Sequence, residues 1–104
     1  MIVRITADRQ LQLEDAEDFK RFAIQVDWAR ADFGHVKASF PNVLTLDDAS
    51  HGWVLISALR SWPGLPAGQD WQDKLSTMIN AAEHHGWIDG ERQAIKAHIV
   101  WAQS

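Results

Sequence analysis

The chain has 104 residues, a formal net charge of -4, six tryptophans, no tyrosine and no cysteine. This length suits one domain, residues 1–104, whose core is large enough to need no covalent cross-link. The absence of cysteine excludes a disulfide framework, a thiolate metal site and a thiol nucleophile. Because acidic and basic residues are interspersed, without a run of Lys or Arg, the sequence argues against nucleic acid and anionic membranes as partners.

Targeting signals and known motifs add little to this picture. The first ten residues lack a basic region followed by a long apolar run, so they do not resemble a signal peptide. No apolar stretch approaches the roughly 20 residues that a membrane-spanning helix needs. With the lack of cysteine, these features predict a cytoplasmic protein. A phosphate-binding loop, a nucleophile elbow and a metal motif are all absent from the sequence, so we expect no cofactor and no metal.

The N-terminal segment alternates as a half-buried strand does. Its apolar side carries Met1, Val3 and Ile5. Arg4 falls on the less buried side. The polar residues 7–12 predict a turn, which Leu11 and Leu13 could extend into a short hairpin.

Residues 14–40 admit two interpretations. In the first, a single helix spans residues 14–33, with acidic residues in its first turn and phenylalanines in its buried stripe. In the second, residues 22–26 alternate as a strand, and Asp27 caps a helix that stops at Pro41. The stripe of that helix is Ala29, Phe33, Val36 and Phe40. We prefer the second interpretation because it accounts for more of the apolar residues, although it places a glycine inside a helix.

The segment that organises the chain is residues 51–60, the longest nearly unbroken apolar run. Its residues 53–56 are four large apolar residues in succession, which indicates an interior strand that is dry on both faces. A short strand at residues 43–46 precedes it, and the turn-rich residues 47–52 join the two as a hairpin.

The clearest helix begins at Asp70, which caps it, and Asp73 completes a capping box. The buried stripe is Trp71, Leu75, Met78 and Ala82. Gly86 ends this helix in a left-handed conformation. His84 and His85 are neighbours near its end, and side chains of adjacent residues diverge by about 100°, so they do not chelate one ion. A last strand spans residues 93–101.

These elements predict an α+β fold, with a two-layer sandwich built on a mostly antiparallel sheet of four to five strands. Two helices would cover one face of that sheet. If residues 14–33 form one helix, the order becomes the ferredoxin-like βαββαβ arrangement.

The face without helices is where we expect a functional surface. We place Val54, Ile56 and Ala58 on it. The residues beside them are Arg4, Thr6, Lys96, His98 and Val100. A half-apolar face is unfavourable in water, so a second subunit, a small ligand or the loop of residues 47–50 should cover it. The six tryptophans support this, because some of them should line a pocket or an interface.

Two functions are consistent with these features. The first is a small binding or protein-interaction module, homodimeric or an accessory subunit of another protein. Its ligand or interface residues would be Arg4, Trp53, Ile56, Lys96 and His98. The second is a small acid–base enzyme, an isomerase or lyase, that acts on a carboxylated metabolite. There His51 is the base, Asp48 orients it, and Arg4 and His98 hold the carboxylate.

Overall fold

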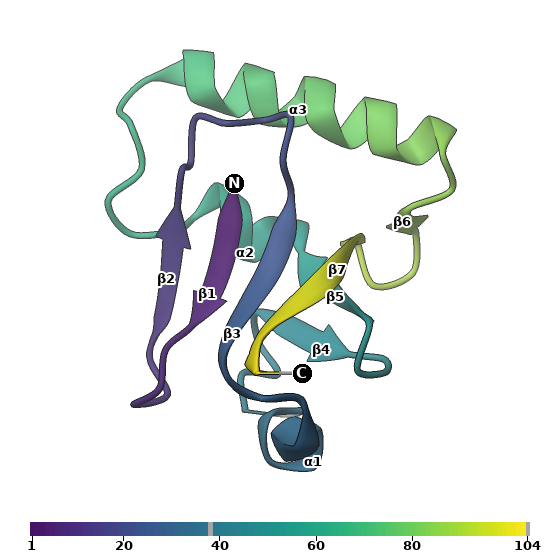
Figure 1. Cartoon of the computed structure of the whole chain (residues 1–104). Coiled ribbons are helices and arrows are strands. Elements are labelled where there is room, and N and C mark those ends of the chain that lie inside the picture. Colours follow the sequence, from purple (N-terminus) through teal and green to yellow (C-terminus); the bar gives the residue numbers. More distant parts are fainter. Residues whose placement is uncertain (38, 104) are drawn as a thin grey trace.

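The computed structural model describes residues 1–37 and 39–103, in which there are seven strands and three helices (Figure 1). The strands are β1 (Ile2–Ile5), β2 (Leu11–Glu14), β3 (Ala23–Ala29), β4 (Leu44–Leu46), β5 (His51–Leu55), β6 (Ile88–Asp89) and β7 (Ala94–Gln103). The helices are α1 (Phe33–Val36), which follows the 3-10 turn η1 (Arg30–Asp32), α2 (Ile56–Arg60) and α3 (Gln69–His84).

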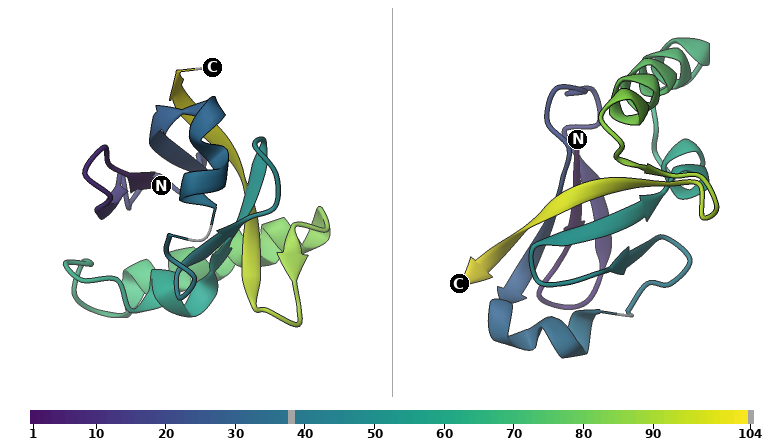
Figure 2. Two further views of the ribbon diagram at one scale, coloured as in Figure 1. Left: turned by 90° about the horizontal axis from the view of Figure 1, so that it is seen from below. Right: turned by 90° about the vertical axis from the view of Figure 1, so that its right-hand side faces the viewer.

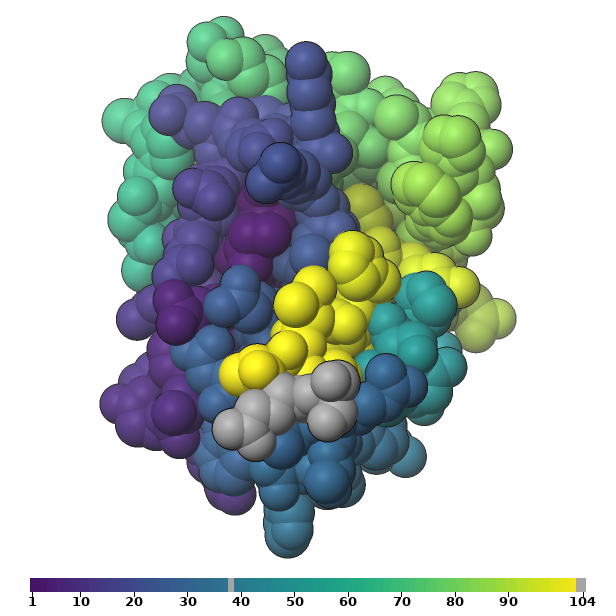
Figure 3. All heavy atoms as spheres, in the orientation of Figure 1, coloured from purple at the N-terminus to yellow at the C-terminus, as the bar shows by residue number. Residues whose placement is uncertain are grey.

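Every strand in the described part of the chain joins one mixed sheet. Its order is β2-β1-β3-β7-β5-β4, and β6 also pairs with β7. β1 pairs with β3 and β3 with β7 in parallel, whereas the other pairs are antiparallel. The sheet curls into a half-barrel, which leaves β2 and β4 as its two edges (Figure 2). The space-filling view shows β7, in yellow, exposed between the blue and teal residues of its neighbours (Figure 3).

The core fills the inner side of the half-barrel. Val3, Ile24 and Ile99 lie across from one another on β1, β3 and β7, and all three are buried. The longest helix, α3, crosses one end of the sheet, and α1 lies at the other end (Figure 1). α3 contributes Trp71 and Leu75 to the same core, so the helix and the sheet bury their apolar sides together.

Several sequence-based predictions are confirmed. The N-terminal strand and the last strand form where alternation predicted them. The hairpin of β4 and β5 also forms, although β5 begins at His51, which was predicted to lie in the turn. The stripe of α3 is also confirmed, with its buried members Trp71, Leu75 and Ala82. Gly86 has a φ of 75°, as a left-handed helix end requires. The start of α3 differs slightly, because Gly68 and not Asp70 is its N-cap residue.

The predicted architecture is wrong. The sheet is not a mostly antiparallel one of four or five strands with two helices on one face. It is a seven-stranded mixed sheet, accompanied by two short helices and one longer helix. The reason lies in β3, which inserts between the first and last long strands and runs parallel to both. The ferredoxin-like order does not arise, because no helix joins β1 to the next strands in the sheet.

The single helix over residues 14–33 is also wrong, since residues 23–29 form β3. The strand of the second interpretation is confirmed, but its helix is reduced to η1 and α1, which cover residues 30–36. Asp27 does not cap that helix, because it lies within β3 and accepts a hydrogen bond from Nε of Arg4 at 2.8 Å.

The apolar run of residues 51–60 is half strand and half helix. β5 ends at Leu55, and α2 begins at the next residue, Ile56. Val54 is completely buried on the inner side, so its predicted place on the outer face is wrong. Trp53 and Leu55, which alternate with it, are the half-buried residues of the outer face. Ile56 and Ala58 belong to α2, and therefore they do not extend that face either.

Candidate functional site

A cavity of about 850 Å³ opens between the two edges of the half-barrel. We call this cavity the mouth. Its lining comes from β2, from the residues before β4, and from α2 and the loop after it. These residues are Leu11, Gln12, Leu13, Glu14, Asn42, Val43, Ser57, Ala58, Ser61, Trp62 and Pro63.

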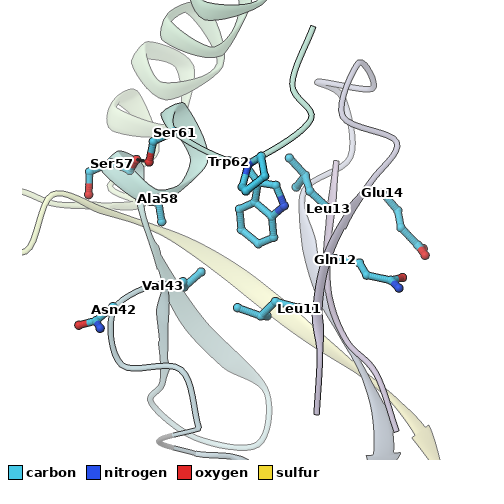
Figure 4. Close-up of a pocket in the computed structure, with 11 residues that line it drawn as sticks. Leu11, Gln12, Leu13, Glu14, Asn42, Val43, Ser57, Ala58, Ser61 and Trp62 are labelled. Carbon is cyan, nitrogen blue, oxygen red and sulfur yellow. Dashed lines mark hydrogen bonds between the residues drawn. The ribbon is translucent and has the colours of Figure 1, made fainter. Parts of the chain in front are cut away.

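The inside of the mouth is apolar. Figure 4 shows Leu11 and Val43 projecting towards each other from opposite sides, with the indole ring of Trp62 between the two walls. Gln12 and Glu14 point away from the cavity in the same view. The mouth therefore has apolar walls and a polar rim, which is the usual character of a small-molecule site.

Local sequence explains how these walls form. β2 alternates, so Leu11 and Leu13 face the mouth while Gln12 and Glu14 face outwards. On the other side α2 is only five residues long and ends at Arg60. Ser61 then donates a hydrogen bond from its hydroxyl to the carbonyl oxygen of Ser57 at 2.7 Å. The chain turns away directly after Trp62, which leaves the indole over the opening.

The tryptophans divide into two groups by their hydrogen bonds. Four of the six indole N–H groups donate to a protein oxygen, at 2.7 to 3.0 Å. These belong to Trp28, Trp53, Trp71 and Trp101. Among the residues that the structure describes, none accepts a hydrogen bond from the indole of Trp62 or Trp87, and each of these two lines a cavity. Trp62 thus brings an available donor to the mouth.

A second cluster lies on the outer face of the sheet. His51 of β5 lies directly across from His98 of β7, and we call these two residues the histidine pair. Lys96 and Trp87 lie beside the pair, around a cavity of about 300 Å³. The sequence-based enzyme hypothesis required His51 and His98 to be close together, and the structure places them on facing positions.

Asp48 forms the turn next to this pair. One of its oxygens, Oδ1, accepts the backbone N–H groups of Ser50 and His51 at 2.7 and 2.8 Å. These hydrogen bonds, and more weakly the nearby charge of Lys96, lower the pKa of Asp48. The same Oδ1 lies 4.0 Å from Nδ1 of His51. Asp48 is therefore an ionised turn residue that faces the imidazole.

Arg4 is not part of this cluster. Its guanidinium makes ion pairs with Glu14 at 2.9 Å and with Asp27 at 2.8 Å. These partners raise the pKa of Arg4 and already balance its charge. β3 also separates β1 from β7, which carries His98. Arg4 is thus not free to hold the carboxylate of a ligand beside His98.

Of the remaining predicted residues, Trp53 and Lys96 lie beside each other on the outer face, and Ile56 does not. Trp53 donates to the carboxylate of Asp47 at 2.9 Å, and the guanidinium of Arg92 lies 5.5 Å from its ring centre. Its ring is therefore covered by its own chain. Lys96 lies across from Trp53 on the outer face, whereas Ile56 begins α2 and is half-buried.

The mouth was not predicted from the sequence. The alternation of Leu11 and Leu13 was visible, but nothing local shows that β2 faces α2. The strongest available signal was Trp62 itself, a large aromatic residue in a loop rich in Pro and Gly. Such a residue has to find an apolar partner elsewhere in the fold.

No protein-family model matches the chain, and neither a curated protein nor a solved structure matches it significantly. Within residues 1–37 and 39–103, no group of three or more His, Cys, Asp or Glu side chains is placed to hold a metal ion. In the same residues, no helix is both long and apolar enough to cross a membrane. The function of the chain is therefore inferred from its side chains alone.

Proposed function

We propose that the chain is a binding module whose mouth takes a small, mostly apolar molecule that carries a hydrogen-bond acceptor. The main support is Trp62, whose ring lies in the opening and whose indole N–H has no acceptor among the described residues. A volume of about 850 Å³ also falls within the range of small-ligand sites.

The energetics favour such an occupant. Leu11, Val43 and Trp62 are only partly buried, so a ligand that covers them removes apolar surface from water. That burial contributes roughly 25 cal/mol per Å² before the costs of association. An acceptor on the ligand satisfies the indole N–H of Trp62 and fixes the ligand's orientation.

A fluorescent probe tests the proposal. 8-Anilino-1-naphthalenesulfonate, whose sulfonate oxygens can accept the indole N–H of Trp62, should bind with saturable, one-to-one stoichiometry, and fatty acids of intermediate chain length should displace it. Ala58→Trp adds a large side chain to the wall of the mouth and should reduce the affinity for the probe at least tenfold. Ala31→Trp adds the same side chain at an exposed position of η1 and should leave the affinity unchanged. Equal probe binding by both variants would rule the mouth out as the site.

Only some of the residues predicted for the acid–base enzyme lie together. His51, Asp48 and His98 lie together, which favours the hypothesis. However, Arg4 is already paired with two carboxylates. Lys96 is the cation nearest to that role, at the edge of the same small cavity. The enzyme hypothesis stays a prediction that lacks its intended carboxylate-binding residue.

A further inference from the structure

The spacing of the histidine pair follows from the hydrogen bonds of the sheet. The backbone N–H of Ile99 donates to the carbonyl oxygen of Ser50 at 2.8 Å. The 50–99 pair is therefore a hydrogen-bonded pair, and the adjacent 51–98 pair is of the closely spaced, non-hydrogen-bonded kind. In such pairs the Cβ atoms are about 4.5–5.5 Å apart, on the same face of the sheet.

Two imidazoles at this separation can reach a common ion. The His51 side chain is 45% exposed and His98 is also exposed, so an ion from solvent can reach both rings. Metal–nitrogen distances of about 2.0–2.1 Å are typical of zinc bound by histidine. One ion located between the two rings, above the sheet, satisfies that distance to both.

Asp48 provides a second, independent observation. Histidines that bind metal commonly donate their other ring N–H to a carboxylate, which fixes the tautomer. Oδ1 of Asp48 lies 4.0 Å from Nδ1 of His51, and two backbone N–H groups hold this carboxylate in place. With the proton on Nδ1, the side that faces this carboxylate, the lone pair of His51 is on Nε2, where an ion can bind it.

We propose that the histidine pair binds one borderline divalent ion, Zn²⁺ or Ni²⁺, through one ring nitrogen of each histidine, with water completing the coordination. Imidazole is a preferred ligand of these metals. Lys96 beside the pair opposes a cation, and Asp48 offsets that charge. Asp48 acts as a positioning residue. The site lies on the outer face, independent of the mouth, and it joins β5 to β7.

Calorimetric titration of the untagged chain with zinc chloride and with nickel chloride tests this proposal. We expect one ion per chain, and at least a tenfold loss of affinity in His51→Ala and in His98→Ala. Asp48→Asn should lose about tenfold, as is typical when the carboxylate partner of a metal-binding histidine is removed. The matched control is the double variant His35→Ala, His84→Ala, which removes two exposed histidines in α1 and at the end of α3 and should bind as the unchanged chain does.

Three results would overturn the proposal. The first is wild-type metal binding in His51→Ala and His98→Ala, with folding verified by circular dichroism. The second is loss of binding in the double variant of the control. The third is binding of inorganic phosphate without binding of either metal, because that result would make the cluster an anion site of Lys96 and the two imidazoles.

Discussion

At the scale of single residues, Gly52 shows how closely the inner side of the sheet is packed. A Cβ atom at this position would lie 2.9 Å from Cδ1 of Ile24 and 3.0 Å from both Cδ2 of Leu46 and the carbonyl oxygen of Thr45. The backbone oxygen cannot move aside as a flexible side chain can. Gly52 is therefore required by close approach, because its φ is not in the left-handed region.

Gly52→Ala should destabilise the fold by about 1–3 kcal/mol, as overpacking of a core does. Gly34→Ala is the matched control, because a Cβ there meets nothing within 4 Å and Gly34 lies inside α1. That substitution should be neutral or stabilising by up to about 1 kcal/mol. Urea denaturation measures both, and equal stability of the two variants would show that the close packing around Gly52 is absent.

Because of the ion pairs of Arg4, the stability of the fold should depend on pH in the acid range. The hydrogen bond from Arg4 lowers the pKa of Asp27, and a weaker one from Gln25 acts in the same direction. A carboxylate with a lowered folded-state pKa adds stability above its unfolded pKa of about 3.9, and this stability is lost as the pH falls through the folded value.

Asp27→Asn should therefore be less stable than the unchanged chain at neutral pH. The difference should persist down to about pH 5 and should shrink progressively below about pH 4. Urea midpoints at a series of pH values measure it. A difference that stays constant down to the lowest pH would mean that the carboxylate charge contributes nothing to stability.

At the scale of elements, the local pattern of apolar residues was sufficient to predict a strand or helix where a single periodicity dominated. Val3 and Ile5 alternate with polar neighbours, and the α3 stripe recurs at helical spacing, so β1 and α3 were predictable. Residues 51–60 were not, because a continuous apolar run does not distinguish strand from helix. The prediction that Asp27 caps a helix was wrong for a different reason. Aspartate is a common helix-cap residue, but here its carboxylate pairs with Arg4 across the sheet.

The short helix α2 depends on one buried side chain, that of Leu59. Leu59→Ala should cost about 2–5 kcal/mol, because it removes buried apolar atoms and leaves a cavity. Ser57→Ala changes an exposed residue of the same helix and should alter stability by less than about 0.5 kcal/mol. Thermal denaturation compares them. A small effect of Leu59→Ala would mean that α2 does not pack on the core as described.

At the scale of the whole molecule, the strand order was beyond the reach of local pattern. The parallel pairs of β3 with β1 and with β7 join segments that are far apart in the sequence. The mouth depends on the same topology, because it opens between β2 and α2 only after the sheet has curled. The histidine pair was partly predictable, since alternation placed His98 on the outer face, whereas its alignment with His51 required the register of β5 and β7.

The structure changes the places of two residues from which self-association was argued, whereas self-association itself stays a prediction. The dimer was argued from Val54 and Ile56 on the outer face, but Val54 is buried and Ile56 belongs to α2. In the part of the chain that the structure describes, the exposed large apolar residues are Trp87 and Val100. Two such residues provide little apolar surface compared with the roughly 1,200–2,000 Å² of accessible surface that a stable interface buries.

Sedimentation at micromolar concentration should therefore give one species near the chain mass of 11.8 kDa. If the chain forms a dimer, the mouth is a candidate interface, occupied by a second copy of the chain. Ala58→Trp, which fills the mouth, separates the two surfaces: a dimer that forms there should dissociate in this variant, whereas a dimer of the outer face should persist.

The most direct test of the mouth as a ligand site uses the indole N–H resonances of the six tryptophans. During titration with 8-anilino-1-naphthalenesulfonate, a nitrogen–proton correlation spectrum should show a large shift for the indole signal of Trp62, together with shifts of the backbone signals of residues 11–14 and 57–62. The indole signals of Trp28, Trp53, Trp71 and Trp101, which donate to protein oxygens, should remain in place. A stationary Trp62 signal, with shifts that instead follow Trp87 and the histidine pair, would contradict the account.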